Sequence, residues 1–109
     1  MAFRIFKTDE FDKVLKKLGN SEQKRVDKIL AQIAERGDEV GKPLSGPFFR
    51  EKKFDGKRLY YLVYKDFSVV LALTIGDKKT QQATINTILL NLAQYQQHVI
   101  ELLRKLGLL

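Results

Sequence analysis

The period of the hydrophobic pattern changes near the middle of this chain, and that change limits the folds open to it. Over residues 8–37 the apolar side chains recur every three or four residues, which is the spacing of amphipathic helices. Over residues 48–75 they alternate, or run continuously among β-branched residues, which is the spacing of strands. Helices followed by a run of strands predict an α+β fold, with the helices on one face of a sheet.

A short strand is expected over residues 3–7, followed by two helices. Thr8 is placed to cap the first helix, which Gly19 ends. The second helix follows directly, with Gln23 three residues after its first residue in a position like that of a capping box, and Gly37 closes it. Because only a tight turn separates them, the two helices predict an antiparallel hairpin.

The strands follow a segment rich in turn residues. Residues 38–47 contain three breaks by glycine or proline and are expected to form a loop. Alternation predicts strands over residues 48–54 and 57–64, joined by an Asp55-Gly56 hairpin turn, and an apolar run over 67–75 predicts a central strand. The predicted order is β-α-α-β-β-β-α, with the three consecutive strands in an antiparallel meander.

The last segment, about residues 80–106, predicts a long C-terminal helix. Residues 80–100 contain no Asp, Glu, Lys or Arg, but they are too rich in Gln, Asn and Thr to span a membrane, so no membrane contact is expected. Apolar residues lie on more than one side of this helix. It is therefore expected to be covered on two sides, either by a second copy of the chain in a homodimer or by a helix of another protein.

Composition limits the chemistry further. The 109 residues include only seven Gly and two Pro, which suits one domain over residues 1–109 without a long linker. The absence of cysteine excludes disulfides, thiolate zinc sites and a cysteine nucleophile. The lone His98 has no metal-ligand spacing, so neither a metal nor a cofactor is expected.

Charge and the N-terminus indicate a partner class and a location. The net charge is +7 and the isoelectric point is about 9.7, so the surface attracts polyanions, chiefly nucleic acid. Residues 1–7 lack the apolar core and cleavage site of a signal peptide. A cytoplasmic nucleic-acid-binding protein is the expectation from these features.

Three short motifs, in the order in which the elements place them, resemble one protein family. Gly41-Lys42-Pro43-Leu44-Ser45-Gly46 resembles the K-x-L-x-G loop that leads into the sheet of RelE-like toxins. Tyr61-Leu62-Val63-Tyr64 resembles their Y-R-L-V-Y strand, and Asp77-Lys78-Lys79-Thr80-Gln81 resembles the K-K-T-Q segment of the HigB-like branch. Together with the element order, the resemblance to the RelE/ParE superfamily covers roughly residues 1–95.

The resemblance implies a RelE-like fold, an activity and partners. Such a protein would be the toxin of a type II toxin-antitoxin system, a metal-independent mRNA interferase that cuts mRNA on the ribosome, inhibits translation and is controlled by a cognate antitoxin. In this endoribonuclease chemistry the RNA 2′-hydroxyl attacks the adjacent phosphate and the 5′-oxygen leaves. The reaction calls for a base, an acid and cationic groups that stabilise the phosphate charge.

The resemblance favours Arg50, Lys52 and Lys78 as site residues, and other polar residues on and just after the meander are further candidates. The catalytic candidates are Arg50, Lys52, Arg58, Tyr61 and Lys78. The candidates for RNA binding are Lys53, Lys57, Lys65, Lys79 and Gln81. Strand alternation puts Arg50 and Lys52 on one face of the sheet, and it puts Arg58 on the face opposite to Tyr61.

Two catalytic positions of the family hold other residues here. The family's arginine in the Y-R-L-V-Y strand aligns with Tyr61, and its C-terminal tyrosine aligns with about Thr84. Two alternatives are therefore open: a ParE-like inhibitor of DNA gyrase, and a catalytically inactive RelE-like module that binds nucleic acid or protein. For Lys53 and Lys57, which share a face or turn with acids, a solvated surface that discourages edge pairing is the favoured interpretation.

Overall fold

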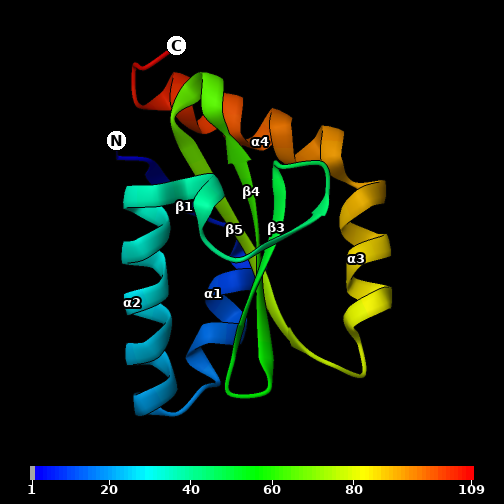
Figure 1. The fold of residues 1–109 in the computed structure, drawn as a ribbon. Helices are drawn as coiled ribbons and strands as arrows, with labels where there is room; N and C mark the ends of the chain where they lie inside the picture. Colours follow the sequence, from blue (N-terminus) through cyan, green and yellow to red (C-terminus); the bar gives the residue numbers. More distant parts are fainter. Residues whose placement is uncertain (1) are drawn as a thin grey trace. The chain divides into compact units, whose positions relative to one another are not determined.

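The computed structural model describes residues 2–109, and the chain divides into two compact units, Met1–Lys78 and Lys79–Leu109. The predicted domain range of 1–109 begins at Met1, which lies outside the described residues, and a single domain stays a prediction. The elements of the first unit, drawn from blue to yellow-green in Figure 1, are β1 (Arg4–Lys7), α1 (Asp9–Lys16), α2 (Asn20–Arg36), η1 (Gly37–Glu39), β2 (Lys42–Ser45), β3 (Phe49–Phe54), β4 (Lys57–Tyr64), η2 (Lys65–Phe67) and β5 (Val69–Asp77). The second unit contains α3 (Gln81–Leu90) and α4 (Leu92–Lys105).

The first unit is built on a five-stranded mixed sheet with the strand order β1-β5-β4-β3-β2. β1 pairs parallel with β5, and all other pairs are antiparallel. This confirms the α+β class and the meander. It corrects the expectation of a loop over residues 38–47, because residues 42–45 form the edge strand β2, which the sequence hides since its Pro43 lacks a backbone donor.

Local sequence explains how the helices begin and end. The Thr8 hydroxyl accepts from the Phe11 backbone N–H at 3.0 Å, so the predicted N-cap of α1 is confirmed. The N-cap of α2 is Gly19, and Gln23 donates to the Leu18 carbonyl at 2.9 Å. The predicted capping box is therefore absent. In its place, the hydrogen bond from Gln23 to the Leu18 carbonyl links α2 to the turn that follows α1.

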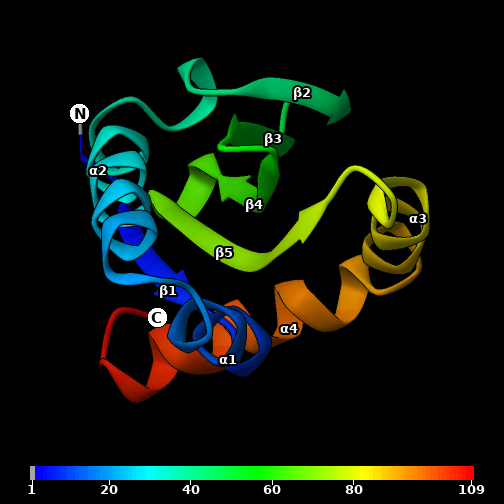
Figure 2. The same ribbon diagram turned by 90° about the horizontal axis from the view of Figure 1, so that it is seen from below.

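One face of the sheet is covered by the helix hairpin of α1 and α2 (Figures 1 and 2). Phe11 from α1 and Val26, Ile29 and Ile33 from α2 are buried in this core. The sheet contributes side chains of one parity to the same core: Phe54, Leu59, Tyr61, Val63, Val70, Ala72 and Ile75. Residues of the other parity, among them Phe49, Tyr60, Leu62, Leu71 and Leu73, are buried as well, which explains why β4 and β5 are apolar without interruption.

The second unit corrects the prediction of one helix over residues 80–106. The helix stops at Asn91, whose side-chain amide donates to the Thr87 carbonyl at 2.7 Å, and α4 starts with Leu92. Asn favours such termini because its side chain competes for backbone hydrogen bonds. No helix within residues 2–109 is long and apolar enough to cross a membrane.

Candidate functional site

The sheet separates the predicted site residues onto two faces. Directly opposite residues of β3 and β4 share a face, and the register pairs Arg50 with Tyr61 and Lys53 with Arg58. Arg50, Lys52 and Tyr61 therefore lie on the face that α1 and α2 cover. Lys53 and Arg58 lie on the opposite face.

Arg50 is buried and holds the segment between α2 and β3 in place. Its guanidinium donates to the carbonyls of Val40 at 2.9 Å, Gly41 at 3.2 Å and Pro47 at 3.2 Å. Only 7% of the residue is exposed. These three bonds use the planar donor set of arginine on backbone acceptors, so in this structure the side chain has a scaffold role.

Tyr61 supports the same segment from the sheet. It is fully buried, and its hydroxyl donates to the carbonyls of Val40 and Gly37. Burial raises its pKa above the ordinary value of 10.0, although the neighbouring Arg50 partly offsets the rise. Gly41 completes the arrangement, because its φ of +72° and its close approach to the Glu51 carbonyl leave no room for a side chain.

The opposite face carries a buried polar cluster of Glu51, Arg58 and Tyr60, which we name the sheet-face cluster. Arg58 Nε lies 3.6 Å from Glu51 Oε1, and the two side chains are 10% and 0% exposed. Tyr60 stands directly opposite Glu51 on β4 and is fully buried. Within residues 2–109 the Tyr60 hydroxyl has no hydrogen-bond partner. The cluster thus combines an oriented cation with a buried phenol that can still donate.

Burial raises the pKa of Tyr60 to about 12, and the nearby Glu51 carboxylate contributes to the rise. Because the folded protein favours the neutral phenol, this stabilisation is complete below about pH 10 and is lost as the pH rises towards 12. We expect an ultraviolet titration of the four tyrosines to show a late ionisation step near pH 12 that Tyr60→Phe removes. A Tyr60→Phe protein with an unchanged late step would show that this phenol is not the shifted group.

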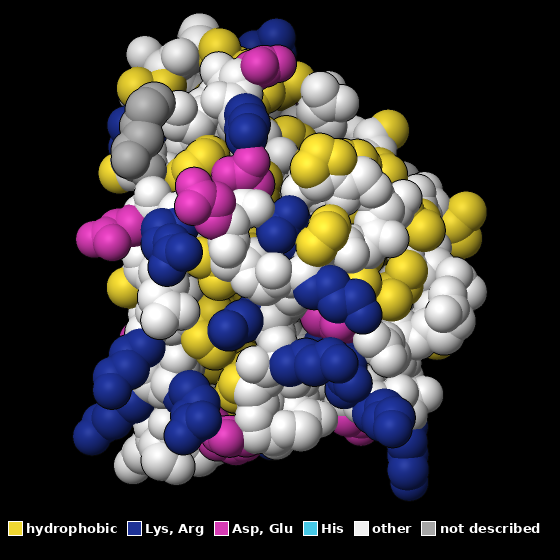
Figure 3. All heavy atoms as spheres, in the orientation of Figure 1, with side chains coloured by type: hydrophobic (Ala, Val, Ile, Leu, Met, Phe, Trp, Pro, Cys, Tyr) yellow, Lys and Arg dark blue, Asp and Glu magenta, His cyan; other side chains and the backbone are white. Residues whose placement is uncertain are grey.

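Basic side chains gather where β3 ends, β4 begins and β5 ends. Lys53 pairs with Arg58 across the β3–β4 ladder, Arg58 pairs with Gly76 of β5, and Lys78 follows two residues later. Lys53 and Lys78 are exposed, and Arg58 is 8% exposed. We name these three residues the basic sheet end. Figure 3 shows Lys and Arg side chains concentrated in the lower part of the molecule, where the turn from β3 to β4 lies in Figure 1.

The remaining candidates occupy different settings. Lys57 forms an ion pair with Glu22 at 2.5 Å, and Lys65 forms one with Asp38 at 2.6 Å. These hydrogen bonds lower the pKa of each carboxyl below its ordinary value. Two further RNA-binding candidates, Lys79 and Gln81, belong to the second unit.

Sequence reasoning passed over two members of the sheet-face cluster, Glu51 and Tyr60. The alternation of Glu51 with Lys53, and of Arg58 with Tyr60, places all four side chains on one face once the two-residue turn fixes the register. Asp55 and Gly56 of this turn both have positive φ, as such a turn requires. The sequence therefore contains the signal for this cluster. Finding it requires the pairing of β3 with β4 across the hairpin as well as the alternation along each strand.

Within residues 2–109 no group of three or more Asp, Glu or His side chains is placed to hold a metal ion. The basic sheet end offers cations that can bind an anion.

Comparisons with known proteins match the fold. No protein-family model matches the chain, and no curated protein matches its sequence. Among solved structures, a mutant of the Escherichia coli toxin RelE in the free state superposes with a TM-score of 0.67 at 23% identity, covering 81% of this chain and 99% of that one. The toxin-antitoxin complex RelBE2 of Mycobacterium tuberculosis gives a TM-score of 0.62 at 18% identity, covering 72% and 100%. The archaeal RelE-RelB complex of Pyrococcus horikoshii gives 0.59 at 15% identity, covering 72% and 97%. The protein therefore has the RelE fold that its element order and motifs predicted.

Proposed function

We propose that this protein is the toxin of a type II toxin-antitoxin system and that it cuts mRNA on the ribosome. The RelE fold supports the first part, since RelE proteins are named as toxins in the matching structures. The juxtaposition of the basic sheet end with the sheet-face cluster supports the second part, and it is the observation on which the proposal chiefly depends. The localisation that goes with this function is cytoplasmic.

Each residue of the two groups has a role suited to phosphodiester cleavage. Arg58 can hold a phosphate by two parallel hydrogen bonds, and Glu51 orients it. Lys53 and Lys78 carry positive charge, which stabilises the negative charge that builds up on the phosphate when the RNA 2′-hydroxyl attacks it. Tyr60 is fully buried and is neutral at physiological pH, because its pKa is about 12, so it lines the cluster opposite Glu51 and cannot act as the base.

Only some of the catalytic residues predicted from the sequence are assigned to the reaction. Arg58 and Lys78 keep a catalytic role, and Lys53, which was predicted to bind RNA, is given one as well. Arg50 and Tyr61 are assigned to the scaffold, since their polar groups are engaged by the segment before β3. Lys52 lies on the other face of β3 from Lys53, so it is not assigned to the reaction.

An antitoxin is the expected protein partner. RelE neighbours have been solved in complex with RelB. The second unit of this chain exposes apolar side chains that suit a protein contact: Leu89, Leu90, Leu106, Leu108 and Leu109. An antitoxin helix is proposed to cover some of these side chains, and a second copy of the chain in a homodimer is the alternative.

Induced expression in growing bacteria tests the toxin assignment. We expect growth arrest, and recovery when the cognate antitoxin is co-expressed. Changing both exposed lysines, Lys53→Gln with Lys78→Gln, should relieve the arrest, because it reduces cleavage by roughly 100-fold without disturbing a buried contact. Lys13→Gln with Lys16→Gln on α1 removes the same charge from exposed positions and should leave the arrest intact. Arrest accompanied by a loss of plasmid supercoiling and intact mRNA would instead identify a gyrase inhibitor.

A further inference from the structure

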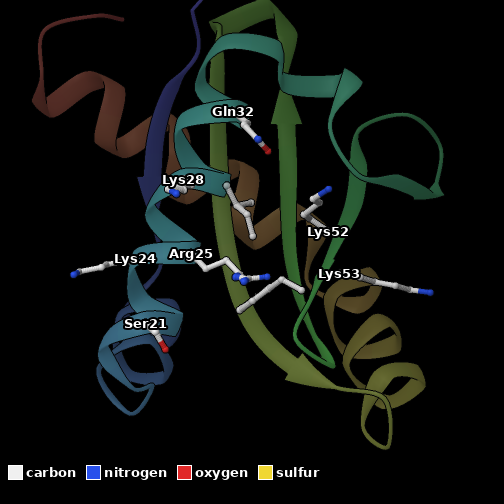
Figure 4. Close-up of a pocket in the computed structure, with 9 residues that line it drawn as sticks. Ser21, Lys24, Arg25, Lys28, Gln32, Lys52 and Lys53 are labelled. Carbon is white, nitrogen blue, oxygen red and sulfur yellow. The ribbon is translucent and has the colours of Figure 1, made fainter.

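A cleft lies between α2 and the end of β3 (Figure 4). Its volume is about 480 Å³, which is within the range of ligand-binding pockets. Five of the residues that line it are basic: Lys24, Arg25 and Lys28 from α2, and Lys52 and Lys53 from β3. All of them belong to the first unit. The cleft is therefore a concentrated positive site, and it lies on the opposite side of β3 from Tyr60.

The sequence builds this cleft through two simple features. Lys24 and Lys28 are four residues apart, with Arg25 between them, so one face of α2 presents three cations. On the other wall, β2 pairs with β3 only as far as Glu51. Lys52 and Lys53 therefore stand where β3 is an open edge of the sheet. In Figure 4, Arg25 extends from α2 towards the strands, whereas Lys24 and Lys53 extend outward at the two rims.

Most of this charge is not neutralised within the molecule. Arg25 forms an ion pair with Asp55 at 3.0 Å, and both side chains remain substantially exposed. In the described part of the chain, the four lysines of the cleft form no ion pair. Four like charges around one cleft repel each other, and a bound polyanion relieves that repulsion.

The apolar lining indicates which kind of polyanion fits. The apolar members, Ile29 and Phe54, are only 5% and 7% exposed, so they offer no accessible anchor. A protein partner draws much of its affinity from such anchors. A nucleic-acid strand needs only cations and hydrogen-bond donors for its phosphates, and Ser21 and Gln32 supply neutral donors beside the lysines.

We propose that the α2–β3 cleft binds the phosphodiester backbone of an RNA strand at a site separate from the sheet-face cluster. The choice of RNA as the polyanion rests on the proposed function. Lys53 borders both the cleft and the basic sheet end, so one strand can pass over the open edge of β3 from one to the other. The cleft then strengthens RNA binding and fixes the position of the strand along the protein, and cleavage takes place on the opposite face of the sheet.

Fluorescence anisotropy with a labelled single-stranded RNA of about 12 nucleotides tests this inference. The probe carries 2′-O-methyl groups, so the full-length protein cannot cleave it through the 2′-hydroxyl during the measurement. For Lys24→Gln with Lys28→Gln we expect the Kd to rise by about tenfold or more. The slope of log affinity against log salt should become shallower by about 1.4, since two phosphate contacts of about 0.7 each are lost.

The matched control is Lys13→Gln with Lys16→Gln, which lies outside the cleft and removes the same net charge. It should change the Kd by less than about twofold and leave the salt slope unchanged. Equal losses in the two double variants would overturn the inference, because general attraction to a basic protein would then explain the binding. Displacement of the RNA by a poly-glutamate peptide at equal charge concentration would also overturn it, in favour of an acidic protein ligand.

The test separates this inference from the proposed function. If mRNA stays intact in cells but the Lys24 and Lys28 changes selectively weaken RNA binding, the cleft inference holds and the proposed cleavage fails. If mRNA is cut but the cleft variant binds the probe like the wild type, the cleft inference fails alone.

Discussion

Arg50→Ala is expected to lower the free energy of unfolding by about 3 kcal/mol or more, measured by urea denaturation. The substitution leaves the carbonyls of Val40, Gly41 and Pro47 without their charged donor, and the bond to Val40 is buried while the other two are partly buried. A hydrogen bond to a charged group contributes roughly 1.5–3 kcal/mol, and losses within one network are not simply additive. The segment between α2 and β3 should loosen first, because Arg50 and Tyr61 both hold it.

Lys52→Ala is the matched control for this prediction. Lys52 lies two residues further along β3 on the same face, is half-buried, and forms no ion pair within residues 2–109. Its replacement should change stability by less than about 0.5 kcal/mol. An Arg50→Ala protein as stable as the wild type would contradict the scaffold role. If the Arg50→Ala protein is destabilised, a loss of toxicity in Arg50 variants is explained by unfolding and not by the loss of a catalytic group.

Arg58→Ala is the second substitution with a large expected effect, a loss of about 3–5 kcal/mol in the same measurement. Removing Arg58 takes a guanidinium away from the carboxylate of Glu51, whose side chain is fully buried. Arg58→Lys keeps the charge but not the two parallel donors. The lysine variant should therefore stay folded while losing most of its activity.

A double variant separates stability from activity at this position. Glu51→Leu with Arg58→Met removes both charges, and replacing a buried pair with apolar side chains is often neutral. We expect this protein to recover at least half of the stability lost in Arg58→Ala and to show no cleavage. Full activity in the folded double variant would remove Arg58 and Glu51 from the mechanism.

The elements that the sequence predicted well are those whose information is local. Thr8 caps α1 through a contact three residues away, and Asp55-Gly56 adopts its turn because both positions tolerate positive φ. The alternating and continuous apolar runs identified β3, β4 and β5 for the same reason. The strand β2 was missed because its four residues include Pro43 and gain their structure from pairing with β3. The break at Asn91 was missed because the apolar pattern continues across it.

The site was predicted less completely than the fold because residue type does not reveal burial. Arg50 and Arg58 carry the same charge, but Arg50 serves the scaffold because a folded loop brings three carbonyls to it. Glu51 and Arg58 are seven positions apart and meet only across the hairpin. The cleft cations Lys24 and Lys28 lie on a helix that sequence reasoning treated only as packing. In each case the missing information is the pairing of segments that are distant along the chain.

Primer-extension mapping of mRNA in translating cells tests the central claim most directly. After induction of the wild type, the account predicts cuts within translated codons. The cuts should be absent with Lys53→Gln plus Lys78→Gln and retained with Lys13→Gln plus Lys16→Gln. Intact mRNA in cells whose growth is arrested by the wild-type protein would contradict the account.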